Sequence, residues 1–63
     1  SEWLVAGLLQ GLSNLEREAV LRITRGQSYA EAARALGVGP KAIDNALQRA
    51  RRKLLRRREA LSA

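Results

Sequence analysis

Apolar residues recur at helical spacing along most of this chain, and no alternating pattern typical of a strand competes with them. Glycine, proline and serine residues divide the pattern into four helical segments with very short joints. The predicted helices cover roughly residues 2–10, 13–26, 28–36 and 40–58. A chain of 63 residues is long enough for one domain. The pattern therefore predicts a single all-α, four-helix domain over residues 1–63.

Two of these helices begin with the same local signal. Ser13 is followed three positions later by Glu16, and Ser28 is followed at the same distance by Glu31. In such a capping box the serine hydroxyl accepts a hydrogen bond from the amide of the glutamate, and the carboxylate accepts one from the amide of the serine. Both bonds satisfy amides that the start of a helix leaves unpaired. The motif predicts two well-defined helix starts.

The joint between the third and fourth helices is the three-residue run Gly37-Val38-Gly39. So short a turn makes two helices cross steeply, as in a helix-turn-helix. The glycine at 37 suits a left-handed backbone conformation, Val38 is an apolar plug, and Ala33 is small enough for close helix contact. An ordinary helical hairpin is the alternative that the turn alone leaves open. We predict a helix-turn-helix over about residues 28–48, with the long last helix as its second member.

The last predicted helix has two unlike faces. The apolar face, which is expected to point into the core, consists of Ile43, Ala46, Leu47, Ala50 and Leu54. The side chains that fall near the opposite side are polar: Lys41, Asn45, Gln48 and Arg52. Arg49 and Arg56 flank this strip on one edge, and Asp44 lies on the other. The pattern predicts a long recognition helix with a polar strip toward solvent.

The net charge of the chain is concentrated in this helix. Residues 1–39 contain four arginines and four glutamates. Residues 40–63 contain eight basic and two acidic residues, so they carry the whole formal charge of +6. A basic element on a neutral body is typical of a protein that binds a polyanion. Turn and charge together predict nucleic-acid binding, with base contacts in the early turns of the helix and phosphate contacts in its later turns.

The polar side chains early in that helix match the edges of bases in the major groove. Asn45 and Gln48 can each make a paired contact with adenine. Lys41 can donate to guanine, and Asp44 can accept from the amino group of cytosine. The alternative for each of these four residues is that it is a polar side chain in solvent without a base contact. For Asp44 a further alternative is that its negative charge stabilises the N-terminus of the helix.

Two more residues are candidates at the start of the third helix. Helix N-termini present free amides that suit a phosphate, so Ser28 and Tyr29 are predicted to clamp the DNA backbone, with capping and packing as the alternative. Trp3 is expected in the core rather than at a partner interface. The predicted DNA-binding residues are Ser28, Tyr29, Pro40, Lys41, Asp44, Asn45, Gln48, Arg49, Arg52 and Arg56.

Several functional classes are not expected from this composition. The chain has no cysteine and no histidine, so disulfides, thiolate chemistry and the commonest metal ligand are lacking. Its six carboxylates are scattered singly, so we expect no enzyme, no metal site and no cofactor. No apolar run approaches the roughly 18 residues that a membrane span needs. The abrupt start at Ser1 suggests a piece of a longer protein.

Four runs of residues resemble the fourth conserved region of bacterial sigma factors. They are LSNLERE (12–18), GQSYAE (26–31), KAIDNALQR (41–49) and RRKL (51–54). The resemblance covers about residues 8–58, and the stretch 41–54 is most similar to the sporulation-type (sigma-H) alternative sigma factors. The first two runs are also similar to LuxR-type regulators, so DNAL (44–47) with the arginines after it is the more specific part.

This resemblance implies a domain that recognises the promoter hexamer near position −35 through the helix that begins at Pro40. It also implies that the first two helices dock the flap-tip helix of the RNA polymerase β subunit, and that the domain is the last of a longer chain. A cytoplasmic, nucleoid-associated location, a monomeric isolated domain and an anti-sigma factor as further partner are expected with it. Gly39 departs from the family, where a serine or threonine cap often stands, so no direct role is expected for it.

Two other functions remain open from the sequence. One is the DNA-binding output domain of a LuxR-type response regulator, which usually acts as a dimer on paired half-sites. The other is a protein-interaction module whose basic helix meets an acidic partner or an anionic membrane surface. The outward strip argues against membrane insertion because it has no large apolar patch beyond Leu55, so no membrane partner is expected.

Overall fold

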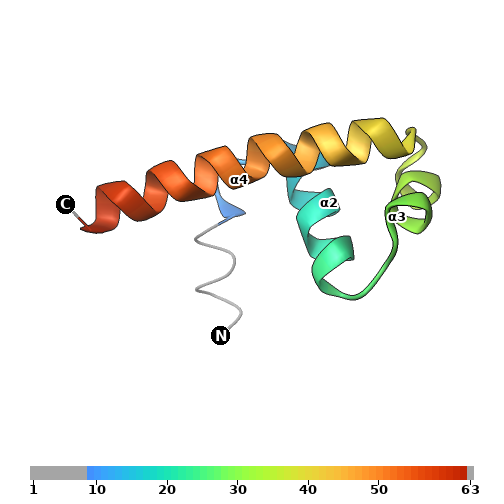
Figure 1. The fold of residues 1–63 in the computed structure, drawn as a ribbon, viewed down its shortest axis with the longest axis horizontal. Helices are drawn as coiled ribbons and strands as arrows, with labels where there is room; N and C mark the ends of the chain where they lie inside the picture. Colours follow the sequence, from blue (N-terminus) through green and yellow to red (C-terminus); the bar gives the residue numbers. More distant parts are fainter. Residues whose placement is uncertain (1–8, 63) are drawn as a thin grey trace.

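Three helices make up the part of the chain that the structure describes. The computed structural model describes residues 9–62, with side chains for residues 9–58. α2 covers Asn14–Thr24, α3 covers Tyr29–Leu36 and α4 covers Pro40–Ser62. α4 runs along the length of the molecule, and both α2 and α3 pack against the same side of it (Figure 1). Within residues 9–62 the structure is all-helical apart from turns and loops, as the sequence predicts.

The predicted first helix, over residues 2–10, lies almost entirely outside the described residues, and so does Trp3. Three of the four predicted helices are confirmed, and the four-helix count stays a prediction. One boundary is corrected, because α4 continues to Ser62 instead of ending near Arg58. Residues 59–61 are favourable or tolerated in helices, and no glycine or proline follows Arg58 to end the helix.

Both predicted capping boxes form. The hydroxyl of Ser13 accepts a bond from the amide of Glu16 at 3.2 Å, and the Glu16 carboxylate accepts one from the amide of Ser13 at 3.0 Å. The pair at the start of α3 repeats this arrangement, at 3.1 Å from the amide of Glu31 and at 2.9 Å from the amide of Ser28. Each helix therefore begins where its serine and glutamate predict.

The turn between α3 and α4 has the backbone that its first glycine allows. Gly37 has φ 69° and ψ 32°, in the left-handed region that a side chain would disfavour. The amide of Val38 donates to the carbonyl of Ala33 at 3.0 Å, which closes α3 with bonding typical of a left-handed cap. Pro40 is the first residue of α4, where a missing amide hydrogen removes no helical bond. The predicted helix-turn-helix is confirmed.

The core is built largely from alanine. Its buried members are Ala19, Ala32, Ala33, Ile43 and Ala46, and the half-buried side chains packed against them are Leu15, Ile23, Leu36, Val38 and Leu47. Small side chains let the three helices approach closely around one large, fully buried residue, Ile43. The predicted inward face of α4 is confirmed, since Ala50 is also buried and Leu54 is half-buried.

α4 is longer than the body that it crosses. Its 23 residues span about 35 Å at roughly 1.5 Å per residue, close to the 38 Å of the longest dimension of the molecule. Its inward apolar face ends at Leu54, and its last turns extend beyond α2 and α3 (Figure 1). No helix in the described range has the length and apolar character to cross a membrane.

Candidate nucleic-acid interface

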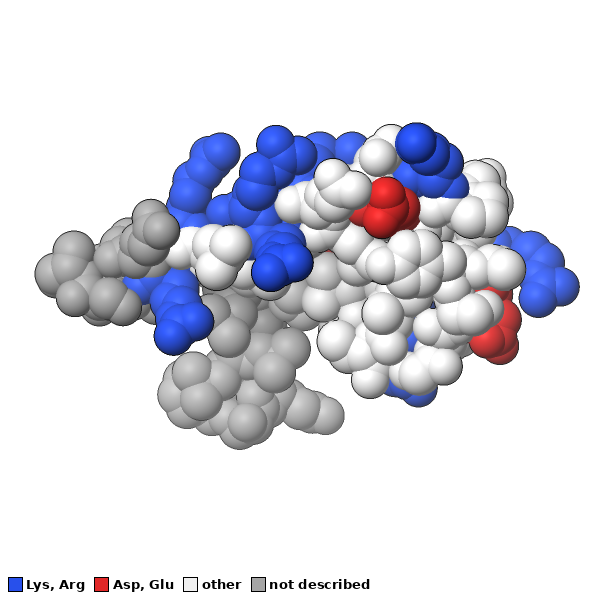
Figure 2. Space-filling model, in the orientation of Figure 1, with Lys and Arg blue, Asp and Glu red and all other residues white. Residues whose placement is uncertain are grey.

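The outward face of α4 is polar and open to solvent. The exposed members of the predicted DNA-binding set on this helix are Pro40, Lys41, Asn45, Gln48, Arg49, Arg52 and Arg56. Asp44 is half-buried. In Figure 2 lysine and arginine side chains gather along α4, whereas most of the surface that α2 and α3 form below it on this face carries no charge. The predicted placement of these residues is confirmed, and their contacts with DNA stay predictions.

One hydrogen bond links two of the predicted base-reading residues. The amide nitrogen Nε2 of Gln48 donates to Oδ2 of Asp44 at 3.0 Å, across one turn of α4. Asn45 lies next to Asp44 in the sequence and is exposed. The early turns of α4 thus present a pair of amide side chains, of which one is oriented by a carboxylate.

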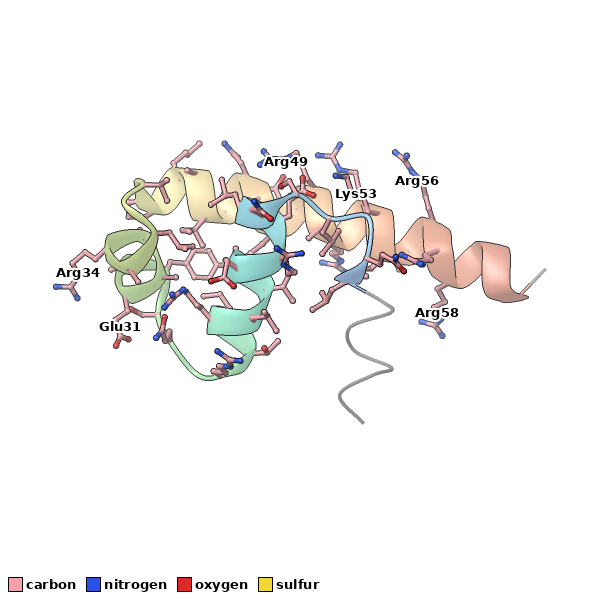
Figure 3. All side chains as sticks on the ribbon, turned by 180° about the vertical axis from the view of Figure 1, so that it is seen from behind. Glu31, Arg34, Arg49, Lys53, Arg56 and Arg58 are labelled. Carbon is pink, nitrogen blue, oxygen red and sulfur yellow. The ribbon has the colours of Figure 1, made fainter. Side chains whose placement is uncertain are left out.

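Two basic triplets follow along α4, Arg51-Arg52-Lys53 and Arg56-Arg57-Arg58, and their side chains are divided between different sides of the helix. Successive residues of a helix are turned by about 100°, so three in a row cannot share one face. Arg56 and Arg58 point to opposite sides of the helix (Figure 3). Arg57 donates to the backbone carbonyl of Gln10, beside a cleft of about 250 Å³ between residues 10–12 and the segment 53–57. The triplets therefore supply both outward cations and contacts within the domain.

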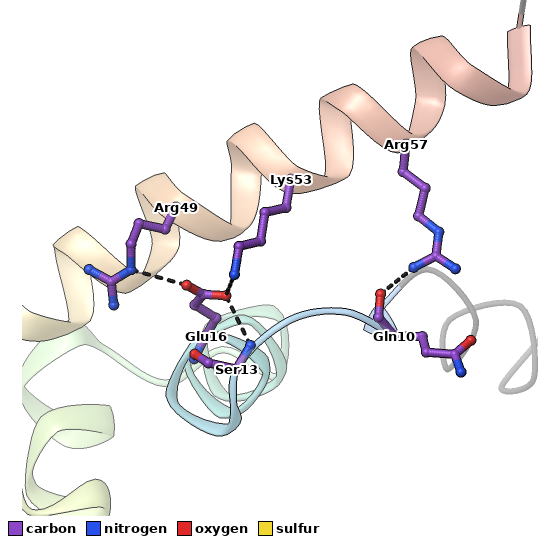
Figure 4. Close-up of polar contacts among 6 residues, drawn as sticks. All are labelled: Gln10, Ser13, Glu16, Arg49, Lys53 and Arg57. Atoms are coloured by element: carbon purple, nitrogen blue, oxygen red, sulfur yellow. Dashed lines mark hydrogen bonds and ion pairs between the residues drawn. The ribbon is translucent and has the colours of Figure 1, made fainter.

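A buried carboxylate joins the start of α2 to the middle of α4. The side chain of Glu16 is 3% exposed. It meets two cations of α4 (Figure 4). The Nε of Arg49 donates to Oε2 at 3.0 Å, and the Nζ of Lys53 donates to Oε1 at 2.7 Å. The amide of Ser13 donates to the same Oε1. Glu16 is therefore both the capping glutamate of α2 and the anion that ties α2 to α4.

These bonds hold Glu16 in its charged form. The hydrogen bond from Lys53, followed by that from the backbone of Ser13, lowers the pKa of Glu16 from 4.5 to about 2, and the bond from Arg49 adds to the effect. Burial acts in the opposite direction because it disfavours a charge. The hydrogen bonds outweigh the burial, so the carboxylate is ionised at any pH at which DNA binding matters.

Glu16 and Lys53 were not among the residues predicted for this region from the sequence. Arg49 was predicted at the edge of the DNA-facing strip, and the structure shows that its Nε donates to Glu16. A guanidinium has four further N–H donors, so the predicted DNA contact of Arg49 is compatible with this bond. The available signal was the spacing of Arg49 and Lys53, which share one edge of the helix four residues apart.

The start of α3 is already occupied by its own carboxylate. The side chain of Glu31 accepts from the amide of Ser28, and this bond lowers the pKa of Glu31. The hydroxyl of Ser28 accepts from the amide of Glu31. Tyr29 is 43% exposed and remains accessible to a partner. A phosphate here would meet a negative charge as well as free amides, and the clamp by Ser28 and Tyr29 stays a prediction.

A match to a known protein family agrees with this geometry. Residues 3–54 match the family described as Sigma-70, region 4. Comparison with curated proteins and with solved structures found no significant match. The matched range includes α2, α3, the turn between α3 and α4, and the part of α4 that carries the outward polar strip. This chain belongs to the sigma-70 region 4 family of helix-turn-helix, DNA-binding transcription domains.

Proposed function

We propose that this chain recognises the −35 element of a promoter as the region 4 domain of a sigma factor. The observation that carries the proposal is the exposed strip of amide and cationic side chains on the outward face of α4, in a chain of this family. The second helix of a helix-turn-helix enters the major groove with its first turns toward the base edges. In α4 those turns carry Lys41, Asn45 and Gln48.

The later turns of α4 are suited to phosphate contacts. Arg52 and Arg56 are exposed and lie one turn apart on the outward side. Phosphate contacts release counterions, so log K falls by roughly 0.9 per neutralised phosphate for each log unit of salt. Four to six such contacts would give a slope of about −4 to −5. Titration of a fluorescent duplex at several salt concentrations measures this slope, and a slope near zero would refute the proposal.

Alanine variants separate the two roles along α4. Gln48→Ala or Asn45→Ala should cost about 1–3 kcal/mol on a duplex selected by the wild type and little on random DNA. Arg52→Ala or Arg56→Ala should weaken both kinds of duplex about equally and reduce the salt slope by about one. Arg25→Ala is the matched control, because it removes one charge just after α2, at the end of α2 far from α4 in Figure 1.

The proposal includes RNA polymerase as the protein partner. α2 and the segment before it are the proposed docking site for the flap-tip helix of the β subunit. Alone, one such unit is expected to bind DNA in the range of about 10⁻⁴ to 10⁻⁶ M that is typical of non-specific contacts. Docking on polymerase makes the DNA contact intramolecular, with effective concentrations that reach the mM range. Capture of polymerase core by the immobilised chain tests this part of the proposal.

Finer assignments belong to the same proposal. The domain is a non-enzymatic, cofactor-free, cytoplasmic module and the last domain of a longer sigma factor of the sporulation type, and an anti-sigma factor is a further proposed partner. A monomer is expected because the apolar side chains of α4 up to Leu54 are used in the core. A LuxR-type domain would instead dimerise on two spaced half-sites. Sedimentation with and without one short duplex separates a monomeric reader from such a dimer.

A further inference from the structure

We propose that Asp44 determines base specificity by orienting the side-chain amide of Gln48, and that it does not itself read a base. The inference rests on the promoter recognition proposed above and assigns one residue a positioning role within it. It starts from the hydrogen bond of 3.0 Å between Nε2 of Gln48 and Oδ2 of Asp44. Both residues lie on α4, four positions apart, where side chains of a helix meet.

The chemistry of the pair fixes which end of the Gln48 amide faces Asp44. An ionised carboxylate offers only acceptors, so the group turned toward it has to be the NH2 and not the carbonyl. A glutamine without such a neighbour can present its oxygen and nitrogen in either order, because the two ends of the amide have nearly the same shape. Asp44 therefore holds Oε1 of Gln48 on the side away from itself and leaves one N–H of Nε2 unused.

The order of these two groups decides which base Gln48 matches. Adenine presents an acceptor, N7, beside a donor, the N6 amino group, in the major groove. The oriented amide offers one acceptor and one free N–H in a single order along the helix. The opposite order would place donor against donor and acceptor against acceptor. By excluding one order, Asp44 narrows the bases that Gln48 accepts at its position in the site.

A positioning role also explains why an anion stands on this strip. The other charged residues predicted to contact DNA from α4 are cations, and a carboxylate near the phosphates of DNA opposes binding. Direct reading of cytosine would have to use the second oxygen of Asp44 or give up its bond to Gln48. The observed geometry instead engages the carboxylate with a neighbouring side chain on the same helix.

Two substitutions at one position separate orientation from charge. Asp44→Asn removes the charge but keeps an oxygen that can accept from Gln48, whereas Asp44→Ala removes both. Each variant and the wild type would select duplexes from a randomised pool, and the bound sequences would be counted. We expect Asp44→Asn to keep the wild-type base profile. In Asp44→Ala the preference for one base over the others should fall about three- to tenfold at one position. Both should bind DNA more tightly overall.

A matched control removes a negative charge elsewhere. Glu18 lies on α2 and pairs with Arg22 at 3.8 Å, so Glu18→Ala changes the net charge by the same amount as Asp44→Ala without touching α4. Its base profile should equal that of the wild type. Helical circular dichroism of each variant checks that α4 is intact. The side-chain amide proton signals of Gln48 should move in Asp44→Ala and much less in Asp44→Asn, which tests the hydrogen bond without DNA.

The decisive comparison uses a background in which Gln48 is absent. In Gln48→Ala, adding Asp44→Ala should leave the base profile unchanged, because the carboxylate has no amide to orient. A changed preference at any position in that background would mean that Asp44 reads a base itself and would overturn the inference. Identical profiles for the wild type and Asp44→Ala would overturn it as well. A wild type that enriches no sequence at all would contradict the promoter recognition on which the inference rests.

Discussion

The two capping boxes of this domain have the same local chemistry and different places in the fold. In each, a serine hydroxyl and a glutamate carboxylate exchange hydrogen bonds with backbone amides at 2.9–3.2 Å. Glu31 is exposed, and the bonds described for its carboxylate stay within its own box. Glu16 is buried and also accepts from Arg49 and Lys53 on α4. One motif thus caps a helix in both cases and joins two helices in only one.

The difference follows from where each helix begins. α2 starts beside the middle of α4, so the carboxylate that closes its first turn faces two cations four residues apart (Figure 4). In Figure 3 Glu31 lies away from the labelled cations of α4. A carboxylate that is desolvated but bonded to two cations and an amide is held more firmly than one in water. The contribution of a capping residue to stability therefore depends on which residues surround it in space.

The largest expected effect is on stability. Glu16→Ala should lower the free energy of unfolding by about 2–3 kcal/mol, because it removes charge-assisted hydrogen bonds to two cations together with a helix cap. Glu31→Ala should cost clearly less, since it removes the cap alone. Urea unfolding followed by far-UV circular dichroism measures both. Equal losses would show that the contact between Glu16 and α4 adds nothing to stability.

The second largest effect is expected on the stability of the domain at low pH. The pKa of Glu16 is about 2 in the folded domain, below its ordinary 4.5. Because the folded value is the lower one, its contribution is complete above about pH 4.5 and is lost as the pH falls toward about 2. The pKa of Glu31 is also lowered, so it acts in the same direction. We expect Glu16→Gln to flatten the fall of Tm with acid more than Glu31→Gln does; the reverse order would contradict the assignment.

Unlike the two capping glutamates, the two capping serines should contribute about equally to stability. Ser13→Ala and Ser28→Ala should each lower the free energy of unfolding by about 1 kcal/mol. In each case the serine hydroxyl accepts a hydrogen bond from the amide three residues further on, at 3.2 and 3.1 Å. Thermal or urea unfolding of the two variants gives the comparison directly. A loss at Ser13 more than about twice that at Ser28 would mean that the hydroxyl as well as the carboxylate depends on α4.

The smallest effect is expected at the cations of α4. Lys53 is 44% exposed, so Lys53→Ala should cost only about 0.5–1 kcal/mol. Arg52→Ala on the outward side is the matched control and should leave stability nearly unchanged. The cost at Lys53 should shrink in high salt and should vanish in a Glu16→Ala background. A cost that persists there would assign it to packing of the lysine stem.

Much of the fold could be predicted because its signals act over a few residues. The serine caps, Gly37 with its φ of 69° and Pro40 at the first position of α4 each satisfy or remove a backbone group within one turn. The face of α4 that enters the core follows from spacing alone, and Ile43 is fully buried as expected. No residue near Arg58 stops a helix, so nothing in the local sequence marks the end of α4. The end predicted near Arg58 was therefore too early, and the helix continues to Ser62.

The outward strip of the candidate site was predictable for the same reason. A side chain opposite the apolar stripe of a helix faces solvent wherever that helix packs by one face, and Asn45, Gln48 and Arg52 do so. The bond between Asp44 and Gln48 lies within one turn, yet either residue has other partners available in a sequence. Spacing alone allows this pair without requiring it.

By itself the sequence determined the three helices, the two capping boxes, the left-handed turn and the concentration of the net charge in the last helix. Only the tertiary structure decided which capping glutamate is buried and which cations of α4 pair with it. The partners of Glu16 lie 33 and 37 positions away in the sequence. They meet because Ala19 of α2 packs into one core with Ile43 and Ala46 of α4, which sets where the two helices cross. A contact that depends on that crossing has no local pattern, since neither partner's neighbours in the chain specify the distance between them.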